Sequence, residues 1–199
     1  RTMKKINAFI LYTEPEQARK TVSELKQSAL VQDIYLLAPG SQVDAPTPGI
    51  EGCEVIGIDG IQSSHTVKKI ANAATTDYTL IYLKPTVLKL GYFALERMIQ
   101  IADDTRAGMV YSDYYAVANG EKKNHPVIDY QEGSLRDDFN FGSLLLYCTP
   151  ALKEAAAKIT EPYQFAGLYD LRLKVSRKHP LVRINEYLYT EVEEDTRAS

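Results

Sequence analysis

The chain has 199 residues, of which 45% are hydrophobic and 25% are charged, and its formal net charge is -3. This length supports one sizeable core, and the weak negative charge gives no electrostatic footprint for DNA, RNA or anionic lipid. No apolar run approaches the roughly 18 residues that a membrane helix requires. We therefore expect one domain over residues 1–199, no nucleic-acid partner, no transmembrane segment and, by default, a cytoplasmic location.

Both ends of the chain look separate from the fold. Residues 1–2 precede Met3 and resemble residues added in cloning, and the acidic end, residues 191–199, looks like a tail or a cut through a longer chain. The two cysteines, Cys53 and Cys148, have neither the spacing of a zinc site nor the density of a disulfide scaffold. We expect both to be buried free thiols.

The first half of the chain alternates apolar runs of strand length with segments of helical periodicity. The first helix is expected to begin with a capping box in Thr13-Glu-Pro-Glu16, with Thr13 as the N-cap. Its apolar stripe consists of Ala18, Val22, Leu25 and Ala29. The strands of this half are expected at residues 6–12, 33–38, 54–59, 78–83 and 107–111, with helices after the first, third and fourth strands.

This alternation predicts an α/β fold with a mostly parallel sheet and helices on both faces. The sequence lacks Gly-x-Gly-x-x-Gly after the first strand and lacks the P-loop pattern, which disfavours dinucleotide oxidoreductases and Walker-type ATPases. The second half is expected to hold a strand over residues 143–148, helices over 149–159 and 167–177, and a closing strand over 181–189.

The stretch from Ala107 to Ser143 draws attention because its apolar run breaks at Ser112-Asp113. That break predicts a carboxylate just past the carboxyl end of a buried strand, where open α/β sheets bind their ligands. An Asn119-Gly120 turn and a loop rich in charged residues follow. The alternative is a solvated surface hairpin with a polar tail, which needs no ligand.

Several stretches, in this order, resemble the family 2 glycosyltransferases, which have a GT-A fold and move a sugar from a nucleotide-diphosphate donor to an acceptor. These stretches are Phe9-Ile-Leu-Tyr-Thr13, Ile34 to Ser41, Ala74 to Thr86, Leu95-Glu-Arg-Met98, Tyr111-Ser-Asp113 with the later Gly120 and Pro126, and Asp137 to Gly142. The resemblance runs over nearly the whole chain. It implies a GT-A-like fold, a nucleotide-diphospho-sugar partner and an acceptor that is a glycan, a lipid-linked sugar or another molecule.

The resemblance also implies donor-binding residues. Tyr12 and Thr13 lie in the turn that contacts the nucleotide in the family, and Asp113 is expected to anchor the donor sugar or a metal bound in a different way. Family members usually hold Mg²⁺ or Mn²⁺ with an Asp-x-Asp motif, and that cation neutralises the leaving diphosphate. They commonly read the donor base with an aspartate from the second strand or the loops after it.

This chain departs from both patterns. Ala38-Pro39 replaces the aspartates of the second strand, so Asp59 is the candidate substitute, and Lys84 and Thr86 occupy the positions of the degenerate Asp-x-Asp motif. An ammonium group cannot ligate a cation, so no residues are assigned to a metal. Either Lys84 itself binds the diphosphate, or the site has decayed and the chain binds a nucleotide sugar without catalysis or serves as a scaffold. A solvated loop lysine is the plain alternative.

The resemblance places a catalytic base near the start of a late helix, where Gly167-Leu-Tyr-Asp170 stands. Asp170 is therefore the candidate base of an inverting transfer, and its alternative role is to stabilise the helix dipole. Asp137 and Asp138 are acceptor-side candidates, although such a charged loop is more often only solvated. A nucleotidyltransferase is disfavoured, because it would ordinarily carry a Gly-rich basic loop after the first strand.

Overall fold

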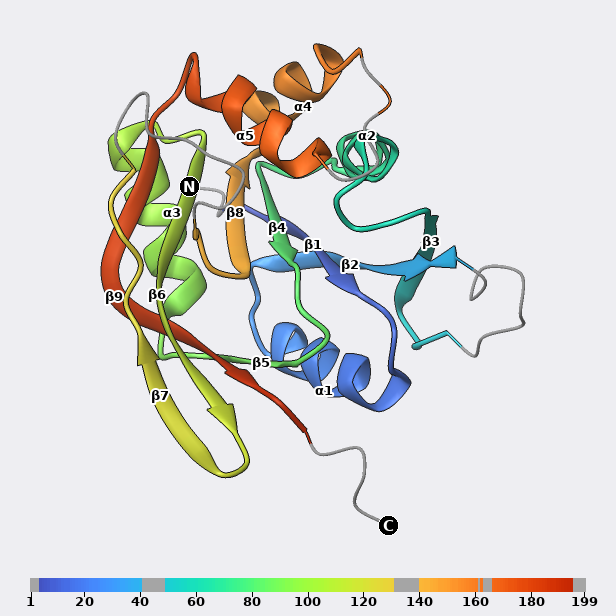
Figure 1. Ribbon diagram of the computed structural model, residues 1–199, viewed down its shortest axis with the longest axis vertical. Coiled ribbons are helices and arrows are strands. Elements are labelled where there is room, and N and C mark those ends of the chain that lie inside the picture. The colour runs from blue at the N-terminus through green and yellow to red at the C-terminus, as the bar shows by residue number, and fades with distance from the viewer. Residues whose placement is uncertain (1–3, 41–48, 131–139, 161, 163–165, 195–199) are drawn as a thin grey trace.

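A computed structural model describes residues 4–40, 49–130, 140–160, 162 and 166–194 (Figure 1). In these residues the chain forms one nine-stranded sheet and five α-helices. The strands are β1 (Ile6–Leu11), β2 (Val31–Pro39), β3 (Cys53–Ile58), β4 (Tyr78–Tyr82), β5 (Val87–Leu90), β6 (Met109–Ala118), β7 (Glu121–His125), β8 (Leu144–Cys148) and β9 (Leu181–Val192). The helices are α1 (Pro15–Lys26), α2 (Ser64–Ala73), α3 (Ala94–Thr105), α4 (Thr149–Ala157) and α5 (Gly167–Ser176).

The sheet has the strand order β3-β2-β1-β4-β8-β6-β9-β5, and β7 pairs with β6 outside this path. Strands β1 to β4 are mutually parallel, and β6 and β9 are parallel to each other. Because β8 is antiparallel to both β4 and β6, these two strands run in the same direction. Only β5, β7 and β8 run against the majority, so the predicted mostly parallel α/β sheet is confirmed.

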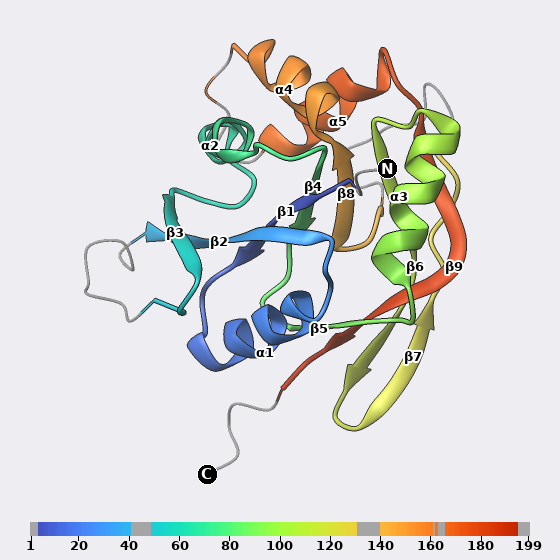
Figure 2. The ribbon, with the colours of Figure 1, turned by 180° about the vertical axis from the view of Figure 1, so that it is seen from behind.

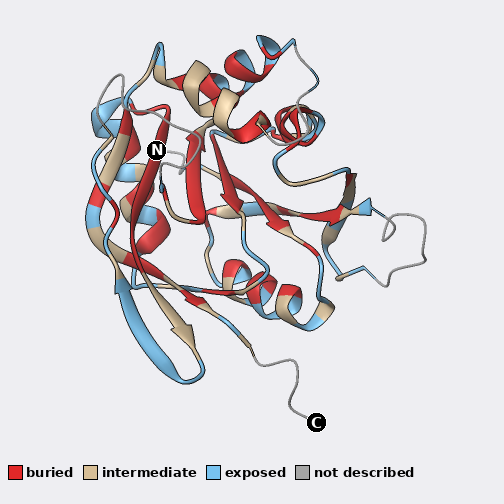
Figure 3. Cartoon of the chain, in the orientation of Figure 1, coloured by how far each residue is buried: buried red, intermediate tan, exposed pale blue. Residues whose placement is uncertain are grey.

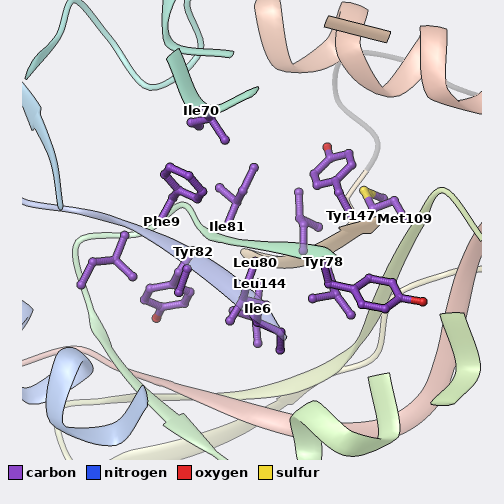
Figure 4. Close-up of a cluster of buried hydrophobic side chains, with 14 of the residues drawn as sticks. Ile6, Phe9, Ile70, Tyr78, Leu80, Ile81, Tyr82, Met109, Leu144 and Tyr147 are labelled. Atoms are coloured by element: carbon purple, nitrogen blue, oxygen red, sulfur yellow. The ribbon is translucent and has the colours of Figure 1, made fainter. Parts of the chain in front are cut away.

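Helices cover both faces of the sheet. Figure 1 shows α2, α4 and α5 together on one side, in mutual contact, and α1 and α3 on the other. The strands between them are largely buried, whereas β7 is exposed along its length (Figure 3). Figure 4 shows that Tyr82 and Tyr147 point to opposite faces of the central strands. The core is therefore divided into two apolar layers, one on each face.

The predicted capping box is wrong. Helix α1 begins at Pro15, and its N-cap is Glu14 in an extended conformation, with no side-chain cap hydrogen bond among the described residues. The reason is steric, because a residue that precedes proline is disfavoured in the helical region. Glu14 therefore could not be the first helical residue after a Thr13 cap. The helix also ends at Lys26, before the expected stripe residue Ala29.

The sequence also placed two strand ends wrongly and missed β5. Strand β6 does not break at Ser112-Asp113 but continues to Ala118, and β9 runs to Val192. Both extensions arise because β6 and β9 pair in parallel over this length, with register shifts on either side of Asp113. Consequently Glu191, predicted to begin an acidic tail, is a buried strand residue.

A buried ion pair joins β6 to β9. The carboxylate of Asp113 accepts hydrogen bonds from Arg183, at 3.1 Å from Nε to Oδ1 and 3.0 Å from Nη2 to Oδ2. It also accepts one from the backbone amide of Val127 at 2.9 Å. The side chain of Asp113 is only 2% exposed. This carboxylate therefore fixes the segment after β7 against the β6–β9 pair.

The start of α5 lies directly against the start of α2. The amide of Gly167 donates to the carbonyl of Gln62 at 2.7 Å. A Cβ atom at Gly167 would lie 2.6 Å from the backbone of Ser63 and Ser64. Real Cβ contacts are essentially never that short, so glycine is required for this approach.

We predict that Gly167→Ala lowers the free energy of unfolding by about 2 kcal/mol, because the added methyl group forces two backbones apart. Gly60→Ala is the matched control, since nothing lies within 4 Å of a Cβ atom at Gly60. The control should leave stability unchanged or slightly higher. Chemical denaturation of the two variants measures both effects, and equal stabilities would contradict this close approach.

We also predict that Asp113→Asn lowers the free energy of unfolding by about 3 kcal/mol, because it replaces the buried carboxylate that faces the Arg183 guanidinium, which is only 17% exposed, with a neutral amide. Asp129→Asn is the control, since Asp129 lies 3.8 Å from Arg183 and its side chain is 76% exposed. Exposed pairs contribute little. Urea denaturation should separate the two variants clearly, and a small effect of Asp113→Asn would show that the pair is dispensable.

Candidate functional site

The carboxyl ends of the parallel strands meet at one edge of the sheet, and several predicted residues lie there. Continuing the β1–β4 register places Tyr12 level with Lys84. The amide of Leu83 donates to the carbonyl of Ser143 at 2.9 Å, so β8 runs beside β4 up to this edge. Asp113 lies inside β6, which continues to Ala118.

Lys84 lies above a buried carboxylate. Its Nζ atom is 3.0 Å from Oε2 of Glu191, and the other oxygen of Glu191 accepts a hydrogen bond from the hydroxyl of Ser143. The side chain of Lys84 is 51% exposed, whereas that of Glu191 is 4% exposed. The ammonium group is therefore anchored on its inner side by a charged partner and remains accessible on its outer side.

Hydroxyl groups surround this pair. The Tyr189 hydroxyl accepts hydrogen bonds from the amides of Ser143 at 3.0 Å and Leu144 at 3.3 Å. The Tyr82 hydroxyl lies 2.6 Å from that of Thr86. Burial raises the pKa of the Tyr82 and Tyr189 phenols well above the ordinary value of a tyrosine. Both phenols therefore stay neutral, and we name the group formed by Tyr82, Lys84, Ser143, Tyr189 and Glu191 the Lys84 cluster.

This chemistry does not fit the usual divalent cation of the resembled family. A hard cation prefers several carboxylate or carbonyl oxygens, but Lys84 and Thr86 stand at the motif positions and both oxygens of Glu191 are engaged. No group of three or more His, Cys, Asp or Glu side chains in the described part of the chain could hold a metal ion. The positive charge at this edge belongs to Lys84.

Asp170 lies in the first turn of α5. Its Oδ1 atom accepts a hydrogen bond from Lys174, one turn later, at 2.6 Å. Its Oδ2 atom is buried and has no hydrogen-bond partner among the described residues. Native structures rarely leave a buried carboxylate oxygen unpaired, so this atom calls for a further donor.

Asp59 directly follows β3 and precedes the turn that leads into α2. Its Oδ2 atom is 3.2 Å from Nδ1 of His65. A hydrogen bond from Ser63 lowers the pKa of Asp59 below its ordinary value, and a hydrogen bond to His65 contributes in the same direction. The carboxylate is about half exposed, so it is ionised and accessible at neutral pH.

The remaining predicted residues lie at or outside the described edge. Tyr12 is buried and Thr13 is exposed directly after β1. Asp137 and Asp138 lie outside the described residues. Among the residues that are described, no hydrogen bond or ion pair joins Lys84, Asp113 and Asp170 to one another.

Sequence reasoning missed the partners of the predicted residues. Glu191 was assigned to a tail, and Arg183, Ser143 and Lys174 were not singled out. Only Lys174 had a local signal, because it lies four residues after Asp170 on the same helix face. The others contact their partners across strands that are 48 to 107 residues apart in the chain.

No described helix is long and apolar enough to cross a membrane. A scan of the sequence against known protein families finds no match. A search of curated proteins also finds no match.

Solved structures do match. The chain is similar to S. aureus TarS residues 1–349, with a TM-score of 0.65 and 12% identity over 94% of this chain. It matches the same fragment in complex with UDP-GlcNAc, with a TM-score of 0.64, 11% identity and 97% of this chain covered. The complex with UDP gives a TM-score of 0.63, 12% identity and 96% coverage. The chain spans about 60% of the length of these fragments, and the fold that it shares with them is GT-A-like.

Proposed function

We propose that the chain is a glycosyltransferase that binds a nucleotide-diphospho-sugar at the carboxyl-end edge of its parallel strands. Ligands of open α/β sheets bind at this edge. TarS, which has the same fold, has been solved in complex with UDP-GlcNAc and with UDP. These two complexes support a uridine-diphosphate sugar as the first donor to test.

The observation that carries this proposal is the position of Lys84. An accessible ammonium group stands where the resembled family places its metal motif, and a buried carboxylate holds it there. A lysine serves as a compact point charge for phosphate groups. Lys84 therefore takes over the role of the cation and neutralises the diphosphate as it leaves.

Asp170 acts as the general base in this proposal. One carboxylate oxygen is held by Lys174, and the other is buried without a described partner, so an acceptor hydroxyl supplies the missing donor. The acceptor oxygen attacks the anomeric carbon and transfers its proton to Asp170. The bond between that carbon and the diphosphate oxygen breaks, and the electron pair leaves with the nucleoside diphosphate, which inverts the anomeric configuration.

A second candidate is a non-catalytic domain that binds a nucleotide sugar or serves as a scaffold. One observation favours it. Asp113, the expected anchor of the donor sugar, already accepts hydrogen bonds from Arg183 and from the amide of Val127. Because these internal hydrogen bonds occupy both oxygens of the carboxylate, Asp113 has little remaining capacity to accept hydrogen bonds from a sugar. Release of UDP from UDP-GlcNAc by the purified chain would remove this candidate.

We predict that the chain binds UDP in the presence of EDTA and that Lys84→Ala weakens this binding about tenfold or more, because the variant removes the charge on the diphosphate. Isothermal titration calorimetry measures both affinities. Lys123→Ala removes the same charge from an exposed position in β7 and should bind like the parent chain. Binding that requires Mn²⁺ and ignores Lys84→Ala would overturn the role of Lys84.

We predict that Asp170→Asn abolishes sugar transfer or donor hydrolysis, by about a hundredfold or more, while UDP binding stays unchanged. The variant keeps the shape of the side chain and removes only its basicity. Chromatographic detection of released UDP measures the reaction, and calorimetry measures the binding. An active Asp170→Asn variant would show that Asp170 serves only the helix.

A further inference from the structure

A pocket lies away from the proposed donor site. Its cavity volume is about 520 Å³, and it lies between the end of α1 and the start of α3. Leu30, which immediately precedes β2, is part of its wall. The pocket therefore opens near the amino ends of the parallel strands, whereas Lys84 follows the carboxyl end of β4. Figure 2 shows α1 and α3, with the chain that follows β5 leading into α3.

Two adjacent aromatic rings border this pocket. Tyr92 is 91% exposed and Phe93 is 64% exposed, and they are two of only four large hydrophobic side chains that are exposed in the described part of the chain. Their ring centroids are 4.5 Å apart and the rings are nearly perpendicular. Exposed aromatic rings gain nothing from the hydrophobic effect, so this pair offers a free stacking surface.

The backbone holds Phe93 in an unusual conformation. Its φ angle is 55°, in the left-handed region that bulky side chains rarely adopt. Phe93 is also the N-cap of α3, where it provides no side-chain cap among the described residues. Small polar residues or glycine are preferred at such a position. A strained backbone that presents an exposed ring is more often found at ligand sites than elsewhere.

The polar groups of the wall include both donors and acceptors. Glu24 and Glu96 supply carboxylates, Gln27 supplies an amide and Ser28 a hydroxyl. The first turn of α3 adds backbone amides at its N-terminus. The side chain of Glu24 is oriented by the amide of Leu90, which donates to its Oε2 atom at 2.8 Å.

The charged side chains that form the wall are carboxylates. The twelve described residues of the wall include two glutamates and neither lysine nor arginine. One ammonium group reaches the wall from outside it, because Lys5 donates to the carbonyl of Ala29, whereas Arg97 pairs with Glu186. The carboxylates outnumber this cation, so the pocket favours a neutral ligand over a nucleotide sugar or an acidic glycan.

We infer that this pocket binds a neutral oligosaccharide. A sugar ring presents a face of C–H groups, which stacks on an aromatic ring, and an edge of hydroxyls, which need both donors and acceptors. The wall of the pocket supplies all three kinds of group. The site is separate from the donor edge, and it binds sugar whether or not the chain transfers one.

The test is binding of the full 199-residue chain, biotinylated at its N-terminus, to an array of neutral and acidic oligosaccharides. We expect binding to neutral glycans, unchanged by saturating UDP. Tyr92→Leu and Phe93→Leu keep apolar bulk but remove the ring, and should weaken binding about tenfold. Tyr92→Phe keeps the ring and should bind like the parent chain.

Three outcomes would overturn the inference: binding to no glycan, binding to acidic glycans alone, or equal binding by the parent chain and the two leucine variants. Both substituted positions are exposed, so the variants are expected to fold like the parent chain. Thermal melts check the fold of each variant, and UDP calorimetry checks its donor edge. If the chain binds glycans but not UDP, the proposed function is wrong and the inference about this pocket still holds.

Discussion

The parallel pairing of β6 with β9 is the interaction on which the rest of the structure depends. Strand β9 is 12 residues long, and it pairs with β6 along most of this length and with β5 near its end. It supplies Arg183 to the buried Asp113 and Glu191 to Lys84. The last described strand therefore pairs with a buried carboxylate inside β6 and holds the ammonium group of Lys84 at the carboxyl-end edge.

This arrangement explains the chemistry of the edge. A buried carboxylate is costly unless it is paired and hydrogen-bonded, and Glu191 meets this requirement through Lys84 and Ser143. The same pairing restricts the ammonium group to one place at the surface. In the proposed function, the fixed ammonium group of Lys84 meets the same electrostatic requirement that a bound cation meets in the resembled family.

The two proposed sites differ in the charge that they present. The Lys84 cluster offers an accessible ammonium group beside neutral hydroxyls, whereas the pocket between α1 and α3 offers carboxylates and exposed rings. Electrostatics alone would thus direct a charged phosphate group to the donor edge and a neutral sugar to the pocket. The pocket lies near the amino ends of the parallel strands and Lys84 follows the carboxyl end of β4, so the two proposed ligands would bind at opposite ends of the sheet.

The sequence by itself determined the alternation of strands and helices in the first half except for the short strand β5, because hydrophobic periodicity is a local property. It also identified Lys84 and Asp170 as the unusual charges. Only the tertiary structure decided where β6 and β9 end and which groups neutralise those charges. Strand length and ion pairing depend on partners far away in the chain, as Lys84 and Glu191 show, and no local pattern records such a partner. Even the false capping box at Thr13 followed from a local rule that another steric rule, at Pro15, overrides.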